Sequence, residues 1–82
     1  MKIELNHFEL KYLNLMINTY NGDLTEVYMD YYDGLYEIKE QINDPEWIEN
    51  MGGNIFLAKK IIELESYNKI LDYLDELMIK NN

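Results

Sequence analysis

Hydrophobic residues recur at helical spacing along most of the 82-residue chain. Between residues 7 and 20 they form a broad stripe at intervals of three and four, which is the period of an amphipathic helix. Asn6 and Glu9 have the spacing of a capping box at the start of this stripe, and Asn21-Gly22 follows it with a pair that commonly ends a helix. The pattern therefore predicts a first helix over about residues 7–20.

The segment from residue 24 to residue 43 admits two interpretations. Its apolar residues would share one face of a helix; they are Leu24, Val27, Tyr28, Tyr31, Leu35, Ile38 and Ile42. Asp33-Gly34, however, is also a strong hairpin turn, and residues that favour strands flank it. A glycine inside a helix costs about 1 kcal/mol, whereas the hairpin would place two acidic residues directly opposite each other. We expect a helix over 24–43, because it accounts for more residues, with a β-hairpin across 27–39 in an α+β fold as the alternative.

The C-terminal half predicts a short helix followed by a long one. Asp44-Pro45 is typical of a helix start, because aspartate caps helices and proline is favoured at their first position. The glycine pair after residue 51 would end that helix. A long helical pattern then covers 55–79, but its apolar face rotates by roughly a quarter turn near Ser66, a residue type that itself caps helices. We therefore expect helices at 45–51 and 55–79, the second with an optional break near residue 66.

Composition limits the class of protein. With 48% hydrophobic and 28% charged residues, residues 1–82 fit one small globular domain. The chain contains no cysteine and a single histidine, His7, which argues against disulfides, thiol chemistry and the usual zinc sites. We find no phosphate-binding loop, EF-hand or catalytic motif. We therefore expect a single acidic, all-α domain of three to four helices that is not an enzyme, has no catalytic residues and uses no metal or cofactor.

The N-terminal residues and the residue usage suggest a compartment and a source. The first ten residues contain two glutamates and no uninterrupted apolar run, unlike a secretory signal, and no stretch is long enough to span a membrane. We therefore expect a cytoplasmic protein with no membrane partner. Isoleucine, asparagine, lysine and tyrosine make up 35 of the 82 residues and arginine is absent, which is typical of AT-rich genes of low-GC bacteria and their phages.

The net charge of −9 is concentrated in one third of the chain. Residues 22–50 contain nine acidic residues and one basic residue, Lys39, for a net charge of −8. Seven of these acids alternate in spacing between three and four, and on a helix they would lie opposite the apolar face. We call them the acidic stripe: Asp23, Glu26, Asp30, Asp33, Glu37, Glu40 and Asp44. Two interpretations stay open for this stripe, a solvated outer face and a binding surface.

Three further residues, Met29, Tyr32 and Tyr36, lie between the acidic stripe and the apolar face of the same helix. Tyrosine is frequent at the centre of protein interfaces, because it buries a large area and loses little entropy. Carboxylates beside exposed tyrosines would suit a basic protein that binds nucleic acid, since nucleic acid presents regular anions beside flat rings. We therefore predict a partner-binding surface made of the acidic stripe and these three residues. Packing of the tyrosines in the core or in a dimer is the alternative.

These features predict a protein that binds another protein. The first hypothesis is a small inhibitor of a basic, nucleic-acid-binding protein, such as a nuclease or a CRISPR effector. In size, charge and composition the chain resembles phage-encoded anti-defence proteins, including anti-CRISPR proteins and DNA mimics, which share no common fold. The acidic balance argues against direct binding of nucleic acid.

Two alternative functions remain. The chain is similar in size and charge to small helical bacteriocin-immunity proteins, so it could be an immunity protein or an antitoxin that neutralises a basic toxin. It could also be a structural module that forms a homodimer, because 11 leucines and 10 isoleucines create near-heptad seams on the longer helices.

Overall fold

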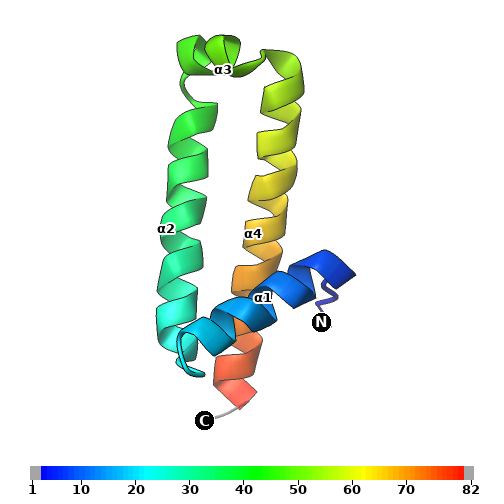
Figure 1. Cartoon of the computed structure of the whole chain (residues 1–82), viewed down its shortest axis with the longest axis vertical. Helices are drawn as coiled ribbons and strands as arrows, with labels where there is room; N and C mark the ends of the chain where they lie inside the picture. Colours follow the sequence, from blue (N-terminus) through cyan, green and yellow to red (C-terminus); the bar gives the residue numbers. More distant parts are fainter. Residues whose placement is uncertain (1–2, 81–82) are drawn as a thin grey trace.

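The computed structural model describes residues 3–80, which fold into helices connected by short turns (Figure 1). The helices are α1 (His7–Thr19), α2 (Leu24–Ile42), α3 (Pro45–Met51) and α4 (Asn54–Lys80). This part of the chain contains no strand. The all-α prediction is therefore confirmed, and the alternative hairpin across 27–39 is wrong.

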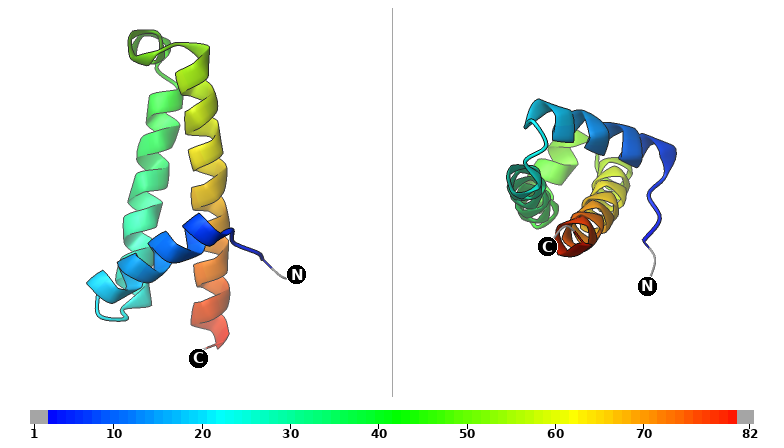
Figure 2. Two further views of the ribbon diagram at one scale, coloured as in Figure 1. Left: turned by 45° about the vertical axis from the view of Figure 1, so that its right-hand side comes forward. Right: turned by 90° about the horizontal axis from the view of Figure 1, so that it is seen from below.

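The two long helices define the shape of the molecule, which measures 44 × 22 × 19 Å. α2 and α4 run antiparallel along the long axis, and the short α3 joins them at one end (Figure 1). Near the other end α1 crosses both long helices on one side of the hairpin (Figure 2). No helix within residues 3–80 combines the length and the apolar composition that crossing a membrane requires.

Local capping signals explain where three of the helices begin. Asn6 and Glu9 form the capping box of α1, in which each side chain accepts a hydrogen bond from the backbone N–H of the other. Asp23 and Asp44 each accept a hydrogen bond from the backbone N–H three residues later, and so cap α2 and α3. These interactions depend only on residues close in sequence, and their positions agree with the predicted helix starts.

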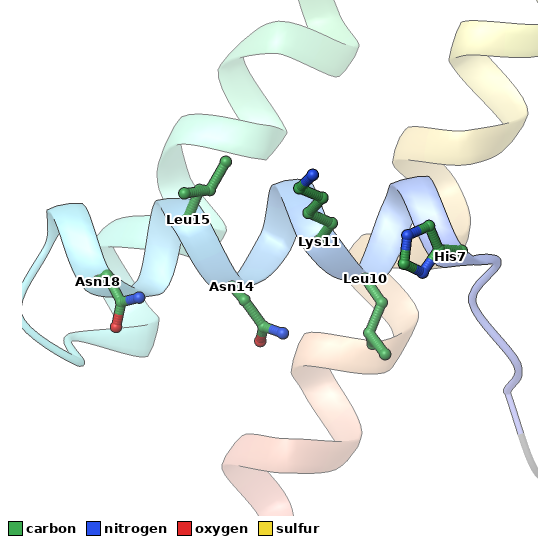
Figure 3. Close-up of a pocket in the computed structure, with 6 residues that line it drawn as sticks. All are labelled: His7, Leu10, Lys11, Asn14, Leu15 and Asn18. Carbon is green, nitrogen blue, oxygen red and sulfur yellow. The ribbon is translucent and has the colours of Figure 1, made fainter.

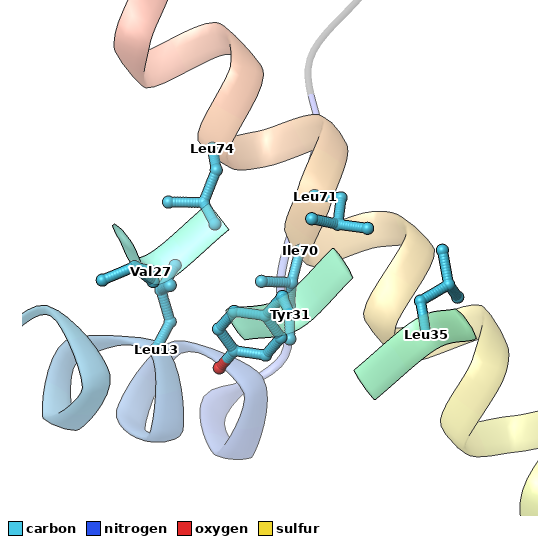
Figure 4. Close-up of a cluster of buried hydrophobic side chains, with 7 residues drawn as sticks. All are labelled: Leu13, Val27, Tyr31, Leu35, Ile70, Leu71 and Leu74. Atoms are coloured by element: carbon cyan, nitrogen blue, oxygen red, sulfur yellow. The ribbon is translucent and has the colours of Figure 1, made fainter. Parts of the chain in front are cut away.

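The hydrophobic core lies where α1 crosses the two long helices (Figure 4). Its buried side chains come from three helices and are Leu13, Val27, Tyr31, Leu35, Ile70, Leu71 and Leu74. Each fully buried aliphatic side chain contributes about 1.5–3 kcal/mol relative to an exposed one. This cluster is what holds α1 against the α2–α4 hairpin.

Gly34, the residue that made a hairpin plausible, lies inside α2. A Cβ atom at this position would lie 2.6 Å from Cε2 of Tyr67 on α4, a distance that real Cβ contacts do not show. The glycine therefore lets the Tyr67 ring approach the backbone of α2. Its presence is explained by close packing of two helices and not by a turn.

α4 runs without interruption, so the break near Ser66 that the sequence analysis allowed is absent. The rotation of its apolar face follows a change in neighbours along its length. The first half packs on α3 in addition to lying along α2 (Figure 1), and the rings of Trp47 and Phe56 meet edge to face with centroids 5.0 Å apart. The second half packs on α1 and α2 through Ile70 and Leu74. Two successive faces thus serve two different contacts on one continuous helix.

Candidate protein-binding surface

The acidic stripe lies on the outside of the molecule. All seven of its residues are exposed, five of them within α2 and the other two at its ends. Because α2 is continuous, the spacing of three and four aligns these residues along one side, with about 5 Å of axial rise between neighbours. The structure therefore provides the alignment that the predicted binding surface requires.

Capping explains part of this stripe. The side chains of Asp23 and Asp44 accept hydrogen bonds from backbone N–H groups at 3.2 and 3.1 Å. Glu26 lies in the first turn of α2, where a negative charge interacts favourably with the helix dipole. The remaining members have no such role within the described chain, and we call them the mid-helix acids: Asp30, Asp33, Glu37 and Glu40.

The lysines of the described chain do not neutralise the acidic stripe. Within residues 3–80, the ion pairs shorter than 4.0 Å are Lys60 with Glu63 at 3.4 Å, and Lys69 with Glu9 at 2.9 Å. Lys39 lies on α2 itself and forms no such pair with a described residue. The carboxylates of the stripe therefore face solvent without compensation from this part of the chain.

Apolar surface accompanies these charges. Met29, Tyr32 and Tyr36 are each more than half exposed, so the alternative that the tyrosines pack in the core of the single chain is wrong. The ring of Tyr32 stacks almost parallel to that of Tyr28, with an angle of 15° between them. Together with Met29 and Asp33 these two rings line a shallow hollow of about 220 Å³. Exposed sulfur and aromatic surface thus lies directly beside a mid-helix acid.

Acidic residues on α2 and α4 raise the pKa of neighbouring tyrosines. The charge of Asp30 is the main cause that raises the pKa of Tyr20, followed by burial, by a hydrogen bond to Asp30 and by the charge of Glu26. For Tyr28, burial contributes most to a raised pKa, and the next largest contribution comes from Asp75 on α4. The sequence analysis did not single out Asp75. Its proximity to α2 follows from the antiparallel packing of the two helices, which the order of residues does not show.

Glu9, which the sequence analysis assigned only to a capping box, is a buried carboxylate. Glu9 is 7% exposed, and it joins α1 to α4 through Lys69 and through the hydroxyl of Ser66, which donates a hydrogen bond to it. Burial alone would raise the pKa of Glu9. Hydrogen bonds from Ser66, from the backbone N–H of Asn6 and from Lys69, together with the lysine charge, outweigh burial and lower that pKa. Ser66 is thus a partner of Glu9 and not a helix cap.

A larger hollow lies on α1 and contains no residue of the acidic stripe. It has a volume of about 340 Å³ and is lined by α1 alone (Figure 3), through His7, Leu10, Lys11, Asn14, Leu15 and Asn18. Because one helix supplies every lining residue, no polar groups from different elements converge there, as they do in most ligand sites. Among residues 3–80, no group of three or more histidines and carboxylates is arranged to hold a metal ion.

The exposed face of α2, and not a pocket, is therefore the candidate site. Its chemistry is electrostatic, with unpaired carboxylates beside tyrosine and methionine surface. Comparisons of this chain with protein-family models, with curated proteins and with solved structures found no match.

Proposed function

We propose that this protein binds a basic, nucleic-acid-binding protein through the acidic stripe and the neighbouring Met29, Tyr32 and Tyr36, and thereby inhibits it. The observation that carries this proposal is the set of mid-helix acids, which neither cap a helix nor pair with a lysine of the described chain. Like charges at i,i+3 and i,i+4 destabilise a helix by about 0.2–0.5 kcal/mol per pair. A basic partner would replace this repulsion with attraction.

The geometry favours a protein that normally holds nucleic acid. Such a protein presents positive charge along a groove and often contacts bases through flat side chains. A row of carboxylates with adjacent aromatic rings offers the same two kinds of contact. Complementary charge accelerates association and makes it sensitive to ionic strength, because the Debye length is about 10 Å at 0.1 M salt.

A capture experiment with matched charge variants tests this proposal. The first variant carries Asp33→Lys, Glu37→Lys and Glu40→Lys, and the control carries the same substitutions at exposed acids elsewhere, Glu4→Lys, Glu49→Lys and Glu65→Lys. Both change the net charge by the same amount. We expect the wild-type protein and the control to capture a basic protein from host lysate at low salt, and the α2 variant to capture none.

The captured protein must then lose its binding to nucleic acid when the wild-type chain is added. Equal capture by the α2 variant, or a captured protein that still binds nucleic acid, would contradict the proposal. An immunity or antitoxin role would use the same face. It would be distinguished by the partner, which would then be a toxin encoded beside this chain.

Self-association is a second candidate, which exposed isoleucines on α4 favour. Ile55 and Ile62 are 73% and 66% exposed, and they lie seven residues apart, so they share one side of the helix. A homodimer through this side would leave the acidic stripe free. Light scattering at two protein concentrations tests it, and a constant monomer mass would contradict it.

A further inference from the structure

A buried hydroxyl group on the inner side of α2 has no partner among the residues that the structure describes. Tyr31 is 3% exposed, and its ring meets the rings of Tyr12 and Tyr67 edge to face, with centroids 6.1 and 5.3 Å away. Its hydroxyl points toward α1 (Figure 4) and has no hydrogen-bond partner among residues 3–80. Buried polar groups are nearly always hydrogen-bonded, so this hydroxyl requires an explanation.

This hydroxyl lies at a small hollow between three helices. Tyr12 and Met16 of α1, Asp30 and Tyr31 of α2 and Tyr67 of α4 line a space of about 30 Å³. A single water molecule needs about 10–15 Å³ by the same measure. The hollow therefore has room for about two to three groups of that size, which is enough for an ammonium group and too little for a whole guanidinium or tetramethylammonium group, each of which has at least four heavy atoms. Of the residues that line it, Tyr12 and Asp30 are exposed, whereas Tyr31 is buried.

The surroundings of this hollow favour a positive charge. Within the described residues, its lining contains three tyrosine rings and one carboxylate, and no lysine or histidine. The rings of aromatic residues attract cations. Burial is the main cause that raises the pKa of both Tyr31 and Tyr67, and Tyr12 and Asp30 add to it in both cases. The negative charge at the hollow comes from the carboxylate of Asp30, which an ammonium group would balance.

We propose that this hollow binds the ammonium group of a lysine side chain, with the hydroxyl of Tyr31 and the carboxylate of Asp30 as acceptors. This inference rests on the proposed function, because the lysine belongs to the basic partner. It adds that one contact of the interface is specific for lysine over arginine. A water molecule would satisfy the hydroxyl equally well, but an ammonium group also compensates the charge of Asp30.

Methylammonium chloride is a suitable probe, because it carries the proposed group and needs no partner protein. The full chain, labelled for NMR, is titrated at constant ionic strength with methylammonium and, separately, with tetramethylammonium. We expect methylammonium to cause saturable shifts at Tyr12, Asp30, Tyr31 and Tyr67, with a dissociation constant in the millimolar range that suits so small a ligand. Tetramethylammonium should leave these signals unchanged, because it exceeds the hollow.

Two variants and one control test the acceptors. Tyr31→Phe and Asp30→Asn should each weaken methylammonium binding by about tenfold, as expected for a lost hydrogen bond to a charged group. Tyr73→Phe, which removes a tyrosine hydroxyl outside both the hollow and the proposed partner-binding surface, should leave the affinity unchanged. Circular dichroism confirms that each variant remains helical.

Equal shifts with both cations, shifts that do not saturate, or an unchanged affinity of Tyr31→Phe would each overturn the lysine site. The last result would indicate that the hollow holds only water. The titration uses no partner protein, so its failure would overturn the lysine site alone. The proposed function is tested separately by the capture experiment, in which Asp30 is not altered.

Discussion

Glu9 and the mid-helix acids are carboxylates in opposite surroundings. Glu9 is buried between α1 and α4 and is satisfied by Ser66, Lys69 and the backbone of Asn6. The mid-helix acids are exposed on α2 and have no ion pair with a described residue. An unpaired carboxylate is costly only where water is excluded. Glu9 therefore needs hydrogen-bond or ionic partners for the fold to be stable, whereas the exposed mid-helix acids on α2 do not.

This difference separates a carboxylate that the fold needs for its stability from carboxylates that are free to bind a partner. A carboxylate that already holds a lysine and two hydrogen-bond donors cannot bind a partner without breaking α1 away from α4. The mid-helix acids can bind without any change in the fold. The same residue type therefore stabilises one region and leaves another free for recognition.

Removal of single carboxylates should show the largest contrast. We expect Glu9→Ala to lower the free energy of unfolding by about 2 kcal/mol, because it removes hydrogen bonds to a buried charge. The matched change Glu37→Ala, also within a helix, should leave stability unchanged or raise it by a few tenths of a kcal/mol, because it relieves like-charge repulsion. Urea denaturation followed by circular dichroism measures both. Equal losses would abolish the contrast.

The adjacent residues Gly34 and Asp33 allow the same comparison of stability between the inner and the outer side of α2. Gly34→Ala should lower the free energy of unfolding by about 1 kcal/mol, because crowding against the Tyr67 ring exceeds the gain in helix propensity. Asp33→Ala on the outer side should not destabilise the protein.

The Tyr67→Ala background provides the control for this pair. With the ring removed, Gly34→Ala should instead raise stability by about 1 kcal/mol, which is the difference in helix propensity. A loss that persists without the ring would show that the contact with Tyr67 is not its cause.

Acidification should weaken the contribution of Glu9 to the free energy of unfolding. Its pKa in the folded protein lies below the ordinary value of 4.5, so near pH 4 the unfolded chain binds more protons than the folded one. Stability from this group is therefore complete above pH 4.5 and is lost as the pH falls through the folded pKa. Glu9→Gln should reduce the slope of unfolding free energy against pH below 4.5. An identical slope in the variant would argue against this linkage.

Neutralisation of the stripe should have the smallest effect and the opposite sign. Asp33→Asn with Glu37→Gln removes three like-charge pairs within α2 and should raise the free energy of unfolding by about 0.5–1 kcal/mol at low salt. The gain should shrink in 1 M salt, where the Debye length falls to about 3 Å. Thermal melts at two salt concentrations measure it, and a loss of stability would show that these acids support the fold.

Much of the fold was accessible to prediction because its signals are local. The caps Asn6, Asp23 and Asp44 act on backbone groups three residues away, and the spacing of apolar residues defines one face of each helix. The alignment of the acidic stripe along one side of α2 follows from the spacing of its residues, because α2 is a continuous helix. Its role in binding stays a prediction, because neither the fold nor the comparisons test it.

The remaining features depend on residues that are distant in the chain. The Ser66–Glu9 hydrogen bond joins positions 57 residues apart. Ser66 looked like a cap because serine caps helices in many contexts. Nothing in the order of residues shows that the glutamate of a capping box also reaches across to α4.

By itself, the sequence determined where the helices begin and end and which side of α2 carries the charge, since capping and periodicity operate within a few residues. Only the tertiary structure decided that Glu9 is buried, that Gly34 faces a tyrosine ring and that the hydroxyl of Tyr31 has no hydrogen-bond partner in the described part of the chain. Each of these depends on how α1 and α4 pack against α2, and packing brings together side chains whose separation along the chain carries no information about their contact.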